Sequence, residues 1–229
     1  MSCLALCLAT RAFTQNAADA VSELAGQVAL PQSDGSSHKP AVVVWLNPLD
    51  EKQTTKQAAP GHYTLVQKNR MFSPHLLVIP VGSIVNFPNA DPFFHNVFSL
   101  FNGKRFDLGL YESGNSKEVV FSREGVSYIF CNIHPEMSAV VLALSTSMYA
   151  IGDSSVKFSI RMVPPGDYDL HVWIEGTPQP ALNRLTRRVH LREGTPTNVI
   201  VDASNSPLST EQHLNKFGKP YDSNSDSTY

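Results

Sequence analysis

The feature that most constrains the fold of this chain is how often its apolar runs are interrupted. Sixteen Pro and thirteen Gly are scattered between short apolar stretches. Within several stretches apolar residues recur at every second position, as in Leu24, Val28 and Leu30 around Gly26, and this is the period of a half-buried strand. The sequence therefore predicts an all-β fold, with no helix needed beyond about two turns except at the N-terminus.

The same pattern divides the chain into sections. The stretch 50–61 is polar and ends in Pro60 and Gly61, which predicts a linker or long loop. Residues 203–229 are predicted as a polar C-terminal tail. The expected strands are 24–30, 41–46, 63–66, 76–81, 83–87, 95–101, 118–121, 126–131, 138–144, 156–160, 168–173, 186–191 and 198–201.

Composition excludes several classes of protein. With 229 residues, 42% hydrophobic and 17% charged, the chain can bury one large core or two small ones, and it is not a disordered protein. The net charge is −2 and no basic block occurs, so we expect no nucleic-acid binding. No apolar stretch is long enough for a transmembrane span.

The cysteines bear on the cellular compartment. Cys3 and Cys7 lie in residues 1–20, where a short apolar stretch precedes Ala18-Asp19-Ala20, a pattern that resembles a signal-peptide cleavage site. The basic segment expected before it is missing, so the signal would be truncated or degenerate, and an ordinary N-terminal helix is the alternative. Export predicts a periplasmic or otherwise extracytoplasmic protein. Its single remaining cysteine, Cys131, would be free, intermolecular or a metal ligand.

The strongest local signal is a loop that offers three ligand types in close succession. Cys131, His134 and Met137 follow one another at spacings of three, and His95 supplies a second imidazole upstream. A thiolate and two imidazoles with a weak axial thioether are the ligands of a blue-copper site. Zinc would accept the cysteine and the histidines but gains little from the thioether.

Each of these residues has an ordinary alternative explanation. A lone cysteine on a strand is usually a small buried hydrophobe, a lone methionine is usually core, and a turn histidine is usually solvated. Their combination indicates one copper ion held by His95, Cys131, His134 and Met137, although a metal-free relative stays possible. The remaining histidines lack ligand spacing and are predicted to be surface or packed residues, namely His38, His62, His75, His171, His190 and His213.

With these ligands in place, residues 62–144 resemble the cupredoxins, and the Cys-x-x-His-Pro-x-Met loop is most similar to the amicyanin branch. The resemblance extends to Phe72-Ser73-Pro74 and to residues 78–83. It implies a Greek-key β-sandwich, of the amicyanin or plastocyanin kind, with one type 1 copper. It also implies that the backbone of Asn96 donates a hydrogen bond toward the copper-bound sulfur, and that His134, next to Pro135, exposes its ring edge.

The flanking segments have a resemblance of their own. Residues 158–170 are similar to the F-x-I-x-x-V-P-x-G-x-Y-x-L signature of carboxypeptidase-regulatory, or transthyretin-like, sandwiches, and residues 26–28 with Asp34-Gly35 fit the strand and turn that open them. We therefore expect residues 23–50 and 145–202 to form one second small β-sandwich into which the cupredoxin domain is inserted. The alternative is that residues 23–50 and 145–202 are two unrelated additions to the cupredoxin domain.

These observations predict an exported blue-copper protein that carries single electrons. No catalytic constellation is seen, so we expect no enzyme. The resemblance implies a redox partner, a dehydrogenase or a c-type cytochrome, that docks transiently on an apolar rim. The alternative is a copper-binding or partner-binding sandwich in which copper is structural or stored. The rim residues are Pro88, Pro92, Phe93, Phe94 and Pro135.

Overall fold

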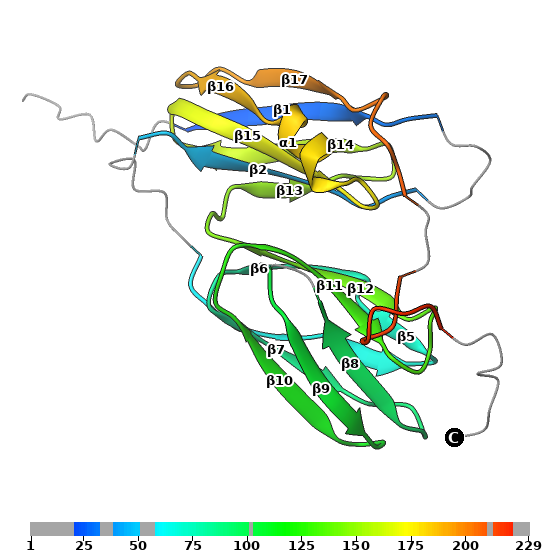
Figure 1. Cartoon of the computed structure of the whole chain (residues 1–229). Helices are drawn as coiled ribbons and strands as arrows, with labels where there is room; N and C mark the ends of the chain where they lie inside the picture. The colour runs from blue at the N-terminus through cyan, green and yellow to red at the C-terminus, as the bar shows by residue number, and fades with distance from the viewer. Residues whose placement is uncertain (1–20, 33–38, 51–57, 101–102, 210–212, 222–229) are drawn as a thin grey trace, which may run out of the picture.

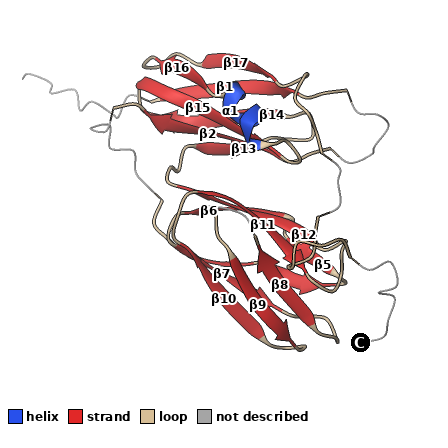
Figure 2. Cartoon of the chain, viewed as in Figure 1, coloured by secondary structure: helices blue, strands red, loops and turns tan. Residues whose placement is uncertain are grey.

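The computed structural model describes residues 21–32, 39–50, 58–100, 103–209 and 213–221. These residues form strands and one short helix, α1 (Gln179–Leu185), as Figure 2 shows. The prediction of an all-β fold is confirmed. None of the described helical residues forms a helix long and apolar enough to cross a membrane. The predicted signal peptide at 1–20 and most of the expected linker at 50–61 lie outside the described residues.

Residues 62–144 form a sandwich of two sheets, in the lower half of Figure 1. Side chains from both sheets meet in one buried cluster that includes Phe87, Phe121, Ile129 and Val141. A short hairpin of β4 (Val66–Lys68) and β5 (Met71–Ser73) accompanies this sandwich. The larger sheet has the strand order β6 (Leu76–Pro80), β12 (Ser138–Leu144), β11 (Gly125–Cys131), β8 (His95–Ser99), β9 (Phe106–Tyr111), and the smaller sheet has the order β10 (Ser116–Phe121), β7 (Ser83–Pro88), β3 (His62–Thr64).

A second sandwich lies above the first in Figure 1. It also has two sheets, and α1 lies beside one of its longest strands. Its core is aromatic and aliphatic, with Tyr168 and Trp173 among its largest buried side chains. One sheet has the order β14 (Lys157–Val163), β1 (Ser22–Ala29), β17 (Thr197–Asp202), and the other has the order β13 (Tyr149–Ile151), β2 (Val42–Pro48), β15 (Gly166–Ile174), β16 (Arg187–Leu191).

The two strands that precede residue 50 pair with strands that follow residue 148. β1 pairs antiparallel with β14 and parallel with β17, and β2 pairs antiparallel with β13 and β15. Among the described strands, neither β1 nor β2 pairs with a strand of residues 62–144. The chain therefore leaves the second sandwich after β2, builds the first one, and returns.

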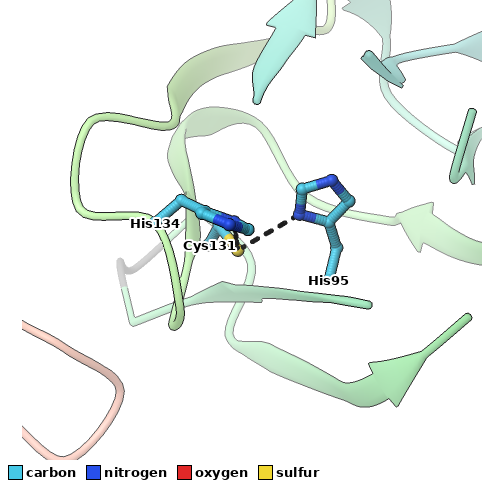
Figure 3. Close-up of side chains that lie close together, drawn as sticks. All are labelled: His95, Cys131 and His134. Carbon is cyan, nitrogen blue, oxygen red and sulfur yellow. Dashed lines mark hydrogen bonds between the residues drawn. The ribbon is translucent and has the colours of Figure 1, made fainter. Parts of the chain in front are cut away.

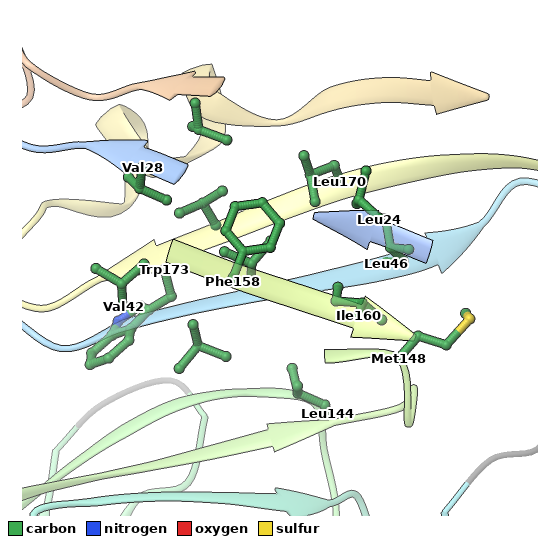
Figure 4. Packing of buried hydrophobic residues seen from close by; sticks show 14 of the residues in the cluster. Leu24, Val28, Val42, Leu46, Leu144, Met148, Phe158, Ile160, Leu170 and Trp173 are labelled. Atoms are coloured by element: carbon green, nitrogen blue, oxygen red, sulfur yellow. The ribbon is translucent and has the colours of Figure 1, made fainter. Parts of the chain in front are cut away.

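Strand β12 joins the two sandwiches because both of its faces are buried. Alternate side chains on a strand point to opposite faces of the sheet. The inner set of β12 side chains packs inside the first sandwich. The outer set packs with the core of the second sandwich, where Leu144 lies near Met148 (Figure 4). A strand buried on both faces is expected to be almost wholly apolar, as the run Ser-Ala-Val-Val-Leu-Ala-Leu is. The inner set is Ala139, Val141 and Ala143, and the outer set is Val140, Leu142 and Leu144.

Candidate metal centre

Three of the four predicted ligands come together at one end of the first sandwich. The Sγ atom of Cys131 lies 3.6 Å from Nδ1 of His95 and 3.6 Å from Nδ1 of His134 (Figure 3). All three ligand atoms lie within 4.8 Å of one another. His95 begins β8, Cys131 ends β11, and His134 lies on the loop between β11 and β12, so the adjacent strands β8 and β11 bring residues 36 apart in sequence to one point.

The loop between β11 and β12 is closed by its own backbone. The N–H of Cys131 donates to the carbonyl of Met137 at 3.3 Å, and the N–H of Met137 donates to the carbonyl of His134 at 3.0 Å. Met137 therefore returns to the start of the loop, where its side chain is completely buried in the same cluster as Cys131. The loop is a compact turn that brings the Cys131 thiol and the His134 imidazole together, with the buried Met137 at its end.

The two imidazoles differ in exposure. His95 is completely buried, whereas His134 is half-buried. Burial lowers the pKa of His95 and of His134, and the neighbouring His95 lowers the pKa of His134 further. Both rings are therefore favoured in the neutral form that binds metals.

A carboxylate that the sequence motif does not reveal orients His95. Nε2 of His95 lies 2.9 Å from Oδ2 of Asp91, so its Nδ1 is left to face Cys131. The Asp91 carboxylate also accepts the backbone N–H groups of Asn69 at 2.6 Å and Arg70 at 3.0 Å. The only sequence signal is an aspartate four residues before the histidine.

The turn that holds Asp91 has an unusual backbone. Asn69 and Arg70, between β4 and β5, both have positive φ angles, 56° and 55°, the pattern of the tight turn that suits a two-residue hairpin. This conformation aims two successive amides at one carboxylate. Burial works to raise the pKa of Asp91, but the hydrogen bonds from Arg70, His95 and Asn69 together hold it below its ordinary value. Asp91 is thus a stable anion beside His95.

The thiol of Cys131 is also surrounded by backbone donors. Burial raises its pKa, and hydrogen bonds from the backbone of Asn96, Ile133 and His134 act in the opposite direction. The contact from Asn96 is the one that the family resemblance implies. The carbonyl of Asn96 accepts the N–H of Asn132 at 3.2 Å, so the ends of β8 and β11 are bonded to each other around the sulfur.

Aromatic side chains border the imidazoles. The ring centroid of Phe93 lies 5.3 Å from that of His95 and 5.5 Å from that of His134. Phe94 is 48% exposed, Pro92 is exposed, and Pro88 and Pro135 are half-buried. The guanidinium of Arg70 lies 5.3 Å from the centroid of Phe93. Two of the predicted rim residues, Pro92 and Phe94, are therefore exposed, and a third, Phe93, contacts the ring of His134.

The donor set fits a soft or borderline metal ion. One thiol sulfur and two neutral imidazole nitrogens suit copper better than Mg²⁺ or Ca²⁺, which prefer oxygen ligands. His95, Cys131 and His134 would hold such an ion.

Comparisons with known proteins give matches among solved structures alone. No family model matches the chain, and no curated protein matches it. A purple cupredoxin from Nitrosopumilus maritimus is 30% identical, with a TM-score of 0.33, over 36% of this chain and 99% of that protein. A mutant of amicyanin in the Cu(I) state is 17% identical, with a TM-score of 0.35, over 37% of this chain and 83% of that protein.

A third match corrects one expectation. The copper-containing nitrite reductase from Thermus scotoductus SA-01 is 23% identical, with a TM-score of 0.35, over 43% of this chain and 25% of that protein. The prediction that the chain is not an enzyme, which was made because no catalytic constellation is seen, is wrong as an inference, because this enzyme is among the similar structures. A redox metal does not require acid, base and nucleophile side chains, so a sequence without such a constellation can still belong to an enzyme.

The three similar structures each cover less than half of the chain. The purple cupredoxin, the amicyanin mutant and the nitrite reductase match 36% to 43% of the chain, and they do not confirm the transthyretin-like resemblance of residues 158–170. The chain is an all-β protein with two sandwiches, and its neighbours among solved structures are cupredoxins.

Proposed function

We propose that this chain binds one copper ion through His95, Cys131, His134 and Met137 and transfers single electrons. The observation that carries the proposal is the convergence of one sulfur and two imidazole nitrogens within 4.8 Å. Copper bound there would supply a one-electron couple between Cu(II) and Cu(I). Electron transfer needs a site that rearranges little, and the backbone bonds that close residues 131–137 favour a fixed ligand geometry.

His134 is the side chain through which we propose that electrons leave and enter. Its ring is half-buried, while His95 is completely buried behind Phe93 and Asp91. The partner we propose is a redox protein, a dehydrogenase or a c-type cytochrome, that docks briefly on the apolar surface around Phe94.

The one-electron role is tested by voltammetry of the copper-loaded full chain. We expect a reversible one-electron wave. Met137→Leu should keep the copper and raise the potential, because the variant lacks the weak axial donor that favours Cu(II). No wave in the unaltered protein would contradict the electron-transfer role, and a lower potential in Met137→Leu would contradict the axial assignment.

The docking surface is tested by placing a charge in the rim. Phe94→Lys should slow electron exchange with a redox partner and leave the absorption spectrum unchanged, because Phe94 is not a ligand. Met162→Lys is the matched control, since Met162 is 76% exposed on β14 of the second sandwich. Equal exchange rates in the two variants would show that the rim does not take part in docking.

We further propose export, with the site working in the periplasm or another extracytoplasmic space. The support is Ala18-Asp19-Ala20 after a short apolar stretch. Mass spectrometry of the protein isolated from its host should find an N-terminus at Val21 or beyond. An intact Met1 in the cytoplasmic fraction would refute export.

A further inference from the structure

Residues 213–221, here called the C-terminal strap, return from the second sandwich to the metal-binding loop. Figure 1 shows this segment beside the end of the first sandwich. The hydroxyl of Tyr221 donates to the carbonyl of Cys131 at 2.7 Å, and the N–H of Lys216 donates to Oδ1 of Asn132 at 3.0 Å. The ring of His213 stacks on Phe130, with centroids 3.8 Å apart. The strap therefore contacts three consecutive residues, Phe130 to Asn132.

The strap has an internal structure that fixes where Tyr221 lies. The side-chain oxygen of Asn215 accepts the N–H groups of Phe217 at 3.0 Å and Lys219 at 3.1 Å. The N–H of Asn215 donates to the carbonyl of Lys219 at 2.8 Å. Gly218, with a φ of 73°, allows the chain to turn there. An ion pair of 2.9 Å between Lys216 and Asp107 ties this turn to the first sandwich.

The peptide bond between Cys131 and Asn132 is held at both ends. Its carbonyl accepts the Tyr221 hydroxyl, and its N–H donates to the carbonyl of Asn96 at 3.2 Å. Hydrogen bonds on the two ends of one peptide polarise each other and strengthen together. Without the Tyr221 bond, this peptide would keep only the hydrogen bond from its N–H to Asn96 on β8.

We propose that Tyr221 is a positioning residue for the metal-binding loop: its hydroxyl fixes the Cys131 backbone, and so keeps the sulfur placed between the imidazoles of His95 and His134. The importance of this position for copper rests on the proposed function. The contact itself does not, because Tyr221 bonds to the backbone carbonyl of Cys131 and not to a proposed ligand atom.

The first test is amide hydrogen exchange of residues 131–137 in the metal-free full chain. Losing one hydrogen bond should speed exchange of this loop about two- to tenfold in Tyr221→Phe. A chain that ends at Ser209 should exchange there faster still. Tyr149→Phe is the matched control, since Tyr149 lies on β13 of the second sandwich. Residues 131–137 of this variant should exchange as in the unaltered protein.

The second test uses the copper-loaded proteins. Tyr221→Phe should keep the absorption of the site but lose copper to a chelator faster, by the same factor as its loop exchange, whereas Tyr149→Phe should not. Loop exchange unchanged in Tyr221→Phe would overturn the proposal, even if the shortened chain exchanged faster. An unaltered protein without charge-transfer absorption would overturn the proposed function instead, and the exchange result would still decide the role of Tyr221.

Discussion

Single residues around the site show that the orientation of a ligand depends on groups that the ligand motif does not contain. Asp91 fixes one nitrogen of His95, and the backbone amides of Asn69 and Arg70 fix Asp91 in turn. Carboxylate partners of this kind hold metal-binding imidazoles in one tautomer and raise their basicity. A chain of hydrogen bonds therefore connects the hairpin of β4 and β5, through Asp91, to His95.

Asp91→Asn tests this arrangement. The amide is uncharged and offers one oxygen in place of two, so His95 should lose its fixed orientation, and copper affinity should fall about 10- to 100-fold. Competition with a chelator measures it. Asp167→Asn is the matched control, because Asp167 also pairs with a histidine, His190 at 2.9 Å, but on the exposed surface of the second sandwich. Equal affinities in the two variants would contradict a role for Asp91.

The candidate ligands could be proposed from sequence, whereas the groups that support them could not. Cys131, His134 and Met137 lie within seven residues, and their spacing alone indicates a metal-binding loop. Asp91 and Tyr221 act through contacts that depend on how a turn folds and where the tail returns. The polar composition of residues 203–229 gives no sign that Tyr221 lies against Cys131.

Among the elements, the strands with many apolar residues were predicted and those defined by pairing alone were missed. β12 and β15 are long and largely buried; β12 matches its expected range, and β15 extends the expected 168–173 at both ends. β13 has three residues and exists through its pairing with β2. β9 alternates weakly, since Leu110 is 62% exposed and Gly109 interrupts it. α1 begins after Pro178 and has Pro180 in its first turn, and it was also not expected.

Gly26 in β1 tests how the second sandwich is closed. A Cβ atom at this position would lie 2.2 Å from the carbonyl oxygen of Val199 on β17, so Gly26→Ala must push the two strands apart. We expect a loss of about 1–3 kcal/mol in the unfolding free energy of this sandwich. Denaturant unfolding followed by Trp45 and Trp173 fluorescence measures it, while copper absorption should persist. Gln27→Ala, at the exposed next position, is the control, and equal stabilities would contradict close β1–β17 pairing.

For the whole molecule, we propose that residues 23–50 and 145–202 are one folding unit with residues 62–144 inserted. The pairing of β1 with β14 and β17 supports this, because two strands alone are marginally stable in water. The two sandwiches are also coupled, through the outer face of β12 and through a hydrogen bond. Nε2 of His75, before β6, lies 2.6 Å from Oε1 of Glu175, after β15.

This contact gives the coupling a pH dependence. The hydrogen bond to Glu175, which outweighs burial, raises the pKa of His75 above its ordinary value of 6.5. A pKa raised by folding adds stability that is complete below the unfolded value and lost as the pH rises through the folded value. The contribution should stay below about 1 kcal/mol, because the pair is partly exposed and solvent screens it.

The measurement is urea unfolding of the unaltered protein and of His75→Gln at about pH 5 and about pH 9, on either side of this titration. The variant should be less stable than the unaltered protein at the acidic pH, and this difference should shrink at the alkaline one. A stability difference that is the same at both pH values would contradict a charged His75–Glu175 contact.

The optical spectrum of the full chain loaded with Cu(II) shows whether Cys131 and the two imidazoles bind copper. A thiolate bound to Cu(II) with two imidazoles predicts one copper ion per chain and an intense blue, green or purple absorption from sulfur-to-copper charge transfer. Cys131→Ser should lose that absorption, because a hydroxyl cannot supply the transition, while Ser127→Ala on the same strand should keep it. A colourless one-to-one complex, or no copper uptake by the unaltered protein, would contradict the account.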